Sequence, residues 1–171
     1  MANISKAWVV VSLASLGMFS VALFYQYALG TAPCVLCIHA RLWTAGLILV
    51  GAIGMIVRKS LWAQPLLAFL GLGFSYGLGE TAYGLLATER AWSIGSCSFD
   101  AGLPSWFAVD EWLPSIFMPL EPCGYTPELL FGVTMAEGLM AAAVLLGALS
   151  TFQLVGSMAA LIVSSRASRS A

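Results

Sequence analysis

The sequence predicts an all-α membrane protein, a bundle of four transmembrane helices with one long outer loop. Of its 171 residues, 60% are hydrophobic and only 9% are charged, whereas about a quarter of the residues of an ordinary soluble domain are charged. The apolar residues also fall into four stretches of about twenty residues, enough for a helix to cross a hydrocarbon core of about 30 Å. We place these spans at about 7–29, 38–57, 66–87 and 130–154.

The basic residues predict the orientation of the spans, because Lys and Arg next to a span are retained on the cytoplasmic side. Five of them lie at the same set of span ends: Lys6, Arg58, Lys59, Arg166 and Arg169. Both termini are therefore expected in the cytoplasm. The loops at about 30–37 and 88–129 then lie on the outer side of the membrane.

The whole chain, 1–171, is expected to form a single integral membrane domain, because the sequence has no repeat and the turns between spans are short. The first apolar stretch is too long for the apolar part of a cleaved signal peptide, so we expect it to be retained. The last apolar tract, 129–163, is longer than one span requires. It either tilts or continues as a helix on the far surface.

The outer segment 88–128 holds two of the four cysteines and five of the seven prolines. Loops of this length are usually functional. Within it, SWFAVDEWLPSIF (105–117) has aromatic and aliphatic residues close to helical spacing. This pattern predicts a short helix in the membrane interface, where Trp side chains are favoured. The alternative is that the aromatic rings pack a small core within the loop.

The predicted topology places all four cysteines, Cys34, Cys37, Cys97 and Cys123, on the outer side or at its margin. In an oxidising compartment, cysteines form structural disulfides or take part in redox chemistry. In the cytosol, the same four residues would first suggest a metal site.

The stretch PCVLCIHAR places two cysteines at the predicted start of the second span. Cys34, Cys37 and Arg41 are spaced i, i+3 and i+7, so they share one helical face. Pro33 suits the position just before a helix. The N-terminus of a helix stabilises a thiolate and lowers the cysteine pKa from about 8.5. Inserting an arginine into the membrane costs up to about 3 kcal/mol if the side chain reaches the bilayer centre. Arg41, near the hydrocarbon boundary, is therefore a functional candidate.

Other readings of the cysteines remain open. Cys34 and Cys37 could form an inert disulfide while Arg41 extends to the headgroups, although so short a ring stabilises little and is better suited to exchange electrons. Zinc bound by four thiolates is a further alternative. Cys97 and Cys123 could close the loop with an ordinary disulfide, or form a second redox pair that passes electrons by thiol–disulfide exchange.

These residues resemble the DsbB family over almost the whole chain. The resemblance is carried by PCVLCIHAR, by the outer segment with CSF and DEWLPSIF, and by the layout of four spans. It implies a disulfide-generating thiol:quinone oxidoreductase of the bacterial inner membrane, with periplasmic outer loops, that reoxidises a periplasmic DsbA-like dithiol oxidase. The electrons would pass to a membrane quinone, ubiquinone or menaquinone. The resemblance implies no bound metal or flavin, and no nucleic-acid partner.

The resemblance also implies a role for each cysteine. Cys97 would be attacked by the thiolate of the partner protein, and Cys123 would be its bonded mate in the resting enzyme. Cys34 would exchange with Cys123, linking the two outer loops transiently. Cys37 would donate electrons to the quinone as a thiolate, and Arg41 would stabilise negative charge on the quinone oxygens.

The resemblance also bears on residues outside the cysteine motif. Gln26 stands where the family has a glutamine near the quinone, and Glu89 is the nearest candidate for a second such position. Ala40 departs from the family pattern, in which a glutamate often precedes the arginine. His39 is about 200° around the helix from Cys37, which favours packing over proton transfer. Glu80 either belongs to a proton path or pairs with a hydroxyl on another helix.

Two other protein classes share parts of the pattern. A relative of vitamin K epoxide reductase also combines a CxxC, loop cysteines and a quinone, but that family places its CxxC late in the bundle. A tetraspan scaffold or adaptor, resembling a tetraspanin, would carry fixed disulfides in its outer loop and would need no arginine below a dithiol.

Overall fold

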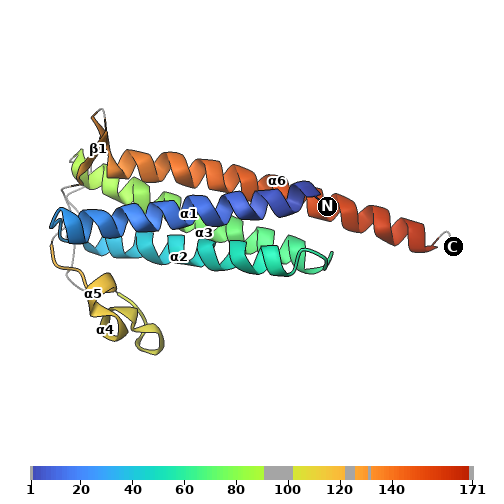
Figure 1. The fold of residues 1–171 in the computed structure, drawn as a ribbon, viewed down its shortest axis with the longest axis horizontal. Coiled ribbons are helices and arrows are strands. Elements are labelled where there is room, and N and C mark those ends of the chain that lie inside the picture. The colour runs from blue at the N-terminus through green and yellow to red at the C-terminus, as the bar shows by residue number, and fades with distance from the viewer. Residues whose placement is uncertain (1, 91–101, 122–125, 131, 170–171) are drawn as a thin grey trace.

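The computed structural model describes residues 2–90, 102–121, 126–130 and 132–169. Four long helices lie side by side and make up most of this structure (Figure 1): α1 (Ala2–Ala28), α2 (Val35–Ile56), α3 (Ala63–Glu89) and α6 (Met135–Arg169). Both termini lie at the end of the bundle away from the short elements of the outer loop.

Three helices in the described part of the chain are long and apolar enough to cross a membrane: Lys6–Ala28, Val35–Ile56 and Met135–Arg166. They coincide with three of the predicted spans and identify a membrane protein. The remaining predicted span, 66–87, lies inside α3, which has the length of a span but is not among these three. A fourth crossing therefore stays a prediction.

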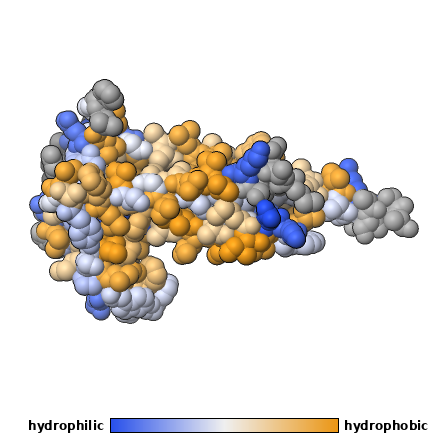
Figure 2. All heavy atoms as spheres, in the orientation of Figure 1, coloured by the Kyte–Doolittle hydropathy of each residue, from blue (hydrophilic) through white to orange (hydrophobic). Residues whose placement is uncertain are grey.

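The long helices are mostly hydrophobic on the face that Figure 2 shows. Large side chains such as Leu49 and Phe152 are 63% and 71% exposed, which would be costly in water. Hydrophilic residues gather at the loop end and near the opposite end of the bundle. This distribution suits helices surrounded by lipid.

The long helices do not pack equally against one another. Helix α3 packs closely along α6 and α2, and α2 packs closely along α1, whereas α1 and α6 make few contacts. Small residues allow the close approaches: Gly51 of α2 faces Ser12 of α1, and a Cβ on Gly79 would lie 3.7 Å from Cβ of Ala143. Ala143 therefore lies in a close contact between α3 and α6.

The last helix differs from the sequence prediction at both ends. The predicted span began at 130, but a short antiparallel hairpin, β1 (Glu128–Leu130) and β2 (Val133–Thr134), precedes α6. The turn contains Gly132 with a positive φ of 78°, a conformation that glycine adopts without strain. At its other end, α6 continues as one helix beyond the rest of the bundle (Figure 1).

The single helix predicted within 105–117 is broken into three short elements: η1 (Ser105–Phe107), α4 (Val109–Trp112) and α5 (Pro114–Phe117). Pro114 explains the break, because proline favours the first turn of a helix and cannot continue the preceding one. Val109 and Phe117 pack on Ile38 of α2, so part of the segment forms a small core. Trp106 and Trp112 stay largely exposed.

Candidate functional site

The two described cysteines lie at the beginning of α2. Cys34 is the N-cap residue, with an extended backbone, and its Sγ accepts a hydrogen bond from the backbone N–H of Cys37 at 3.3 Å. Cys37 lies in the first turn of α2, which begins at Val35, three residues before the predicted span boundary at 38. Both thiols are free in this structure, Cys34 buried and Cys37 half-buried. The dithiol is therefore held by the helix end itself.

The surroundings of Cys34 raise its pKa, whereas the N–H groups at the helix N-terminus lower it. The hydrogen bond with the Cys37 side chain, together with removal from solvent, raises the pKa of Cys34 above its ordinary value. The neighbouring N–H groups lower the pKa by less. Cys34 is thus held as a neutral thiol, so the sequence-based expectation of a stabilised thiolate does not extend to it.

Arg41 lies one turn deeper in α2 and is only 4% exposed. Its Nη1 donates hydrogen bonds to Oε1 of Gln26 and to the backbone carbonyl of Ile116. The Nε2 amide of Gln26 in turn donates to the carbonyl of Ser115 at 2.9 Å. The guanidinium thereby joins α1, α2 and α5. Gln26, which was expected near the quinone, contacts Arg41 but is not among the residues that line the described cavity below.

A cavity of about 480 Å³ opens beside these residues, between α1 and the start of α6. Cys37, Arg41 and Thr44 of α2 form one wall, and Leu139 of α6 lies on another. The cavity exists because α1 and α6 make few contacts. Its remaining lining is mostly apolar and includes Leu13, Met18, Val21, Leu85 and Leu129.

One hydrogen-bond donor in the wall is available to an apolar molecule that carries an oxygen atom. Within the described structure, Nε of Arg41 is buried and has no hydrogen-bond partner, although an unpartnered buried donor is costly. An oxygen of a bound ring would satisfy it. Cys37 lies in the same wall one helical turn away, so a ring in this cavity would meet both a sulfur and a fixed positive charge.

The outer loop returns to the dithiol just before Cys123. Leu120 donates its backbone N–H to the carbonyl of Pro33 at 2.8 Å, and Glu121 forms a parallel bridge with Cys34. Cys97 and Cys123 themselves lie outside the described residues. The part of the loop that is described therefore runs alongside Cys34.

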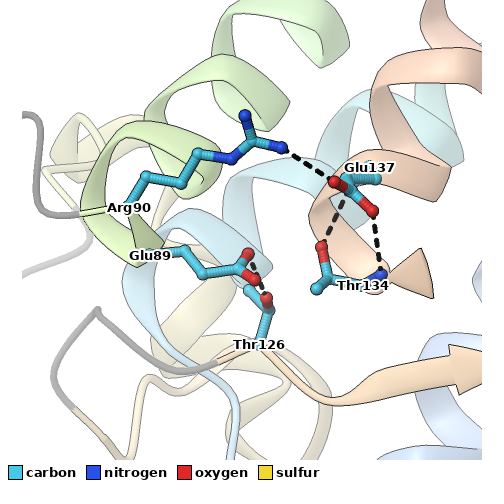
Figure 3. Close-up of polar contacts among 5 residues, drawn as sticks. All are labelled: Glu89, Arg90, Thr126, Thr134 and Glu137. Carbon is cyan, nitrogen blue, oxygen red and sulfur yellow. Dashed lines mark hydrogen bonds and ion pairs between the residues drawn. The ribbon is translucent and has the colours of Figure 1, made fainter. Parts of the chain in front are cut away.

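Glu89 does not belong to the described cavity wall. Its carboxylate accepts a hydrogen bond from the hydroxyl of Thr126 at 2.7 Å (Figure 3), and Thr126 is a wall residue.

Thr134 and Glu137 cap α6 reciprocally, each N–H donating to the other's side chain at 3.3 Å, an arrangement typical of helix starts. Glu137 also pairs with Arg90 at 2.8 Å, which ties the end of α3 to α6.

The structure also places the less certain residues. His39 is half-buried and is not a described wall residue of the cavity. Glu80 accepts a hydrogen bond from the Tyr76 hydroxyl at 2.9 Å, so its described partner lies on the same helix. Sequence reasoning missed Tyr25 and Thr126 in the wall, because nothing in their spacing indicates a cavity formed by distant helices.

The long apolar helices define a helical membrane protein. Its dithiol lies at one end of the bundle, where Cys34 contacts the outer loop and Cys37 lines an apolar cavity. The family described as "Disulfide bond formation protein DsbB" matches residues 5–153. The chain belongs to the DsbB family of disulfide bond formation proteins.

Individual relatives agree with this assignment. The chain is 37% identical over 131 residues to "Disulfide bond formation protein B 2" of Pseudomonas aeruginosa (strain PAO1), covering 75% of this chain and 78% of the relative. It is 34% identical over 136 residues to "Disulfide bond formation protein B" of Shewanella denitrificans, covering 77% and 76%. The protein of that name from Shewanella frigidimarina is 35% identical, with 78% and 80% covered.

Proposed function

We propose that this protein is a thiol:quinone oxidoreductase of the bacterial inner membrane. It oxidises a periplasmic DsbA-like dithiol oxidase and passes the electrons to a membrane quinone, ubiquinone or menaquinone. In this proposal α3 crosses the membrane as the fourth span, both termini are cytoplasmic, and all four cysteines face the periplasm. The family membership and the positive residues at the termini support this arrangement.

One observation carries the proposal: Cys37 and Arg41 line the same apolar cavity. A quinone has an apolar body and two ring oxygens, so it needs both an apolar wall and a hydrogen-bond donor. The cavity opens beside lipid-facing side chains of α1 such as Leu13, which is 62% exposed. A lipid-soluble acceptor can therefore reach the sulfur without passing through water.

Two successive exchanges would bring electrons to Cys37. A thiolate of the partner attacks Cys97, breaking its bond to Cys123, and the second partner thiol then releases the oxidised partner. Cys123 attacks Cys34 of a Cys34–Cys37 disulfide, which frees Cys37 as a thiolate. Cys97 then attacks Cys123, which breaks the Cys34–Cys123 bond and restores the Cys97–Cys123 disulfide. Cys34 and Cys37 are left as the reduced pair, which gives two electrons to the quinone and closes its disulfide again. Cys123 follows Glu121 by two positions, at most about 7 Å of extended chain, and Glu121 is bridged to Cys34. This proximity supports the exchange.

The reaction balances over one turnover. Two partner thiols lose two electrons and two protons as they form a disulfide, and the quinone takes up two electrons and two protons to become a quinol. The chain's own groups orient this transfer: Cys37 presents sulfur at the cavity, and Arg41 holds a permanent positive charge beside the ring oxygens. The potential gap drives it, at about 1.4 kcal/mol per 30 mV.

The decisive experiment is an absorbance spectrum of the purified protein with ubiquinone and with menaquinone. We expect a thiolate–quinone charge-transfer band with the physiological acceptor, lost in Cys37→Ser. The matched control is Cys34→Ser, which frees Cys37 from its disulfide and should keep or strengthen the band. A band that survives in Cys37→Ser, or no oxidation of a reduced DsbA by either quinone, would contradict the proposal.

A tetraspan scaffold with structural disulfides is the second candidate, favoured only by the long outer loop. Thiol trapping separates the two functions. A scaffold keeps fixed disulfides, whereas the proposed enzyme forms a mixed disulfide between Cys97 and a reduced DsbA variant that lacks its second active-site thiol, because that thiol would otherwise release the partner.

A further inference from the structure

The other half of the bundle contains buried hydroxyl and amide groups that the proposed reaction does not use. Ser12 and Ser15 of α1, and Ser150 and Gln153 of α6, are each at most 9% exposed. Among the described residues, their side-chain polar atoms have no hydrogen-bond partner. Other buried serines differ: Ser75 donates to the carbonyl of Gly71 at 2.8 Å. The four unpartnered residues therefore call for a ligand.

These four residues span about two helical turns along the bundle, about 9 Å. Gly51 of α2 faces Ser12, while a Cβ on Gly71 of α3 would lie 3.1 Å from Oγ of Ser150 and 3.8 Å from Val50. Because Val50 and Gly51 are neighbours in α2, Ser12 and Ser150 share a level in the bundle. Because α1 and α6 run in opposite directions, Ser15 lies about 4.5 Å toward the loop end and Gln153 about 4.5 Å toward the chain termini.

The cluster lies between two other polar regions. Toward the loop end, Thr44 is 3% exposed and lines the cavity, and Ser15 sits in α1 between Ala14 and Gly17, both wall residues. Toward the chain termini, Gln64 is 3% exposed and donates to the carbonyl of Val57 at the turn after α2. Buried polar groups thus extend from that turn to the cavity.

We propose that Ser12, Ser15, Ser150 and Gln153 hold internal water molecules that carry protons to the cavity from the end of the bundle opposite the dithiol. A buried water needs two to four polar partners, and this cluster supplies three hydroxyls and one amide. The gap between α1 and α6 that forms the cavity also separates the two halves of the cluster.

This inference rests on the proposed function, because it concerns the two protons that the quinone takes up. The two protons lost by the partner thiols leave on the dithiol side, and the two gained by the quinone enter through the water chain. Arg41 cannot supply them, because a guanidinium does not deprotonate in proteins. Turnover would therefore move charge across the membrane.

Proton uptake can be measured in vesicles that hold the full-length protein, a short-chain ubiquinone and a trapped pH dye. Reduced DsbA added outside does not cross the bilayer, so it drives only molecules whose dithiol faces outward. We expect the lumen to lose about two protons for each quinone reduced. Quinone reduction with no change of lumen pH would overturn the inference and leave the proposed function intact.

Variants locate the route. Ser15→Ala with Ser150→Ala, and separately Gln153→Leu, should slow lumen proton uptake about tenfold and leave the charge-transfer band unchanged. Thr151→Val is the matched control, because Thr151 is exposed on the same helix and its hydroxyl donates within α6. Equal proton uptake in all four proteins would refute the route.

A second measurement needs no quinone. If water bridges the cluster, Gln153→Leu lowers the thermal midpoint, and radiolytic hydroxyl-radical labelling marks the buried neighbours Val11 and Leu146. If the cluster is dry, removing unpartnered polar atoms raises the midpoint and leaves these neighbours unlabelled. The dry result would refute the inference, whether or not the protein reduces a quinone. An absence of quinone-dependent activity would reject the proposed function instead.

Discussion

At the scale of single residues, Arg41 connects the apolar cavity to the outer loop. Its Nη1 is used by Gln26 and by the carbonyl of Ile116, and its Nε is free within the described structure to meet a ligand. A lysine carries the same charge but lacks the planar fork that makes several directed hydrogen bonds at once. The identity of the side chain therefore matters as well as its charge.

We predict that Arg41→Met lowers kcat/KM for the quinone by roughly 10- to 150-fold, because hydrogen bonds to charged groups contribute about 1.5–3 kcal/mol. Arg41→Lys should fall between this variant and the wild type. Steady-state reduction of a short-chain ubiquinone by DsbA measures both. Arg58→Met, at the exposed turn after α2, is the control, and full activity of Arg41→Met would remove Arg41 from the site.

Cys34 provides a prediction with a defined pH dependence. The hydrogen bond with Cys37 and burial raise the folded-state pKa of Cys34 above its ordinary value of 9.0. The reduced folded protein therefore keeps this thiol protonated where the unfolded chain ionises. The resulting stabilisation is complete below pH 9 and is lost as the pH rises toward the folded-state pKa.

We expect the free energy of unfolding of the reduced protein to fall by about 1.4 kcal/mol per pH unit above pH 9. Cys34→Ser should lack this loss. Chemical unfolding in detergent micelles between pH 8 and 10 compares the two proteins, and parallel curves would show that Cys34 is not perturbed.

The site could be predicted from the sequence where it depends on local geometry. Cys37 and Arg41 share a helix face because their spacing is fixed by the helical repeat, and both line the cavity. The cavity itself could not be predicted, because it depends on how closely α1 approaches α6. The raised pKa of Cys34 was missed because burial and a partner thiol outweigh the N–H groups of the helix end.

At the scale of elements, the outer segment 105–117 shows how one proline changes a periodic pattern. The aromatic spacing suggested one helix, but Pro114 divides it into short turns. Phe117 then packs on Ile38, beside the helix turn that carries Cys37 and Arg41. The start of α6 also differs from the predicted span boundary for a local reason. The hairpin before α6 turns at Gly132, and its residues are as apolar as those of the span, so hydropathy alone did not separate the two.

We predict that Phe117→Ala detaches this segment from α2 without unfolding the bundle. Removing a buried phenylalanine costs about 3–5 kcal/mol, and in a small satellite core the loss appears as local opening. Hydrogen exchange in 105–117 should accelerate at least about 100-fold, while α2 keeps its protection. Trp106→Ala, at a side chain that is 77% exposed, is the control, and an equal effect of both variants would exclude this anchor.

At the scale of the whole molecule, the open question is how many helices cross the membrane. The composition of α3 explains why it is less apolar than the other long helices: it contains five glycines, Gln64 and Glu80. The glycines serve packing, since Gly77 faces the ring of Trp43 and Gly71 faces Ser150. Low hydropathy here reflects close helix contacts, so it does not argue against a crossing.

We therefore predict that α3 crosses the membrane and that the chain ends share one side. With 27 residues, α3 is about 40 Å long, more than the hydrocarbon core requires. Alkaline phosphatase, active only outside the cytoplasm, should be active when fused after Arg90 and inactive when fused after Lys59 or the last residue. Green fluorescent protein should give the opposite pattern. If the fusions after Lys59 and after Arg90 report the same side of the membrane, α3 does not cross and three crossings remain. The two chain ends would then lie on opposite sides. That result would also separate the proposed proton entry from the cytoplasm.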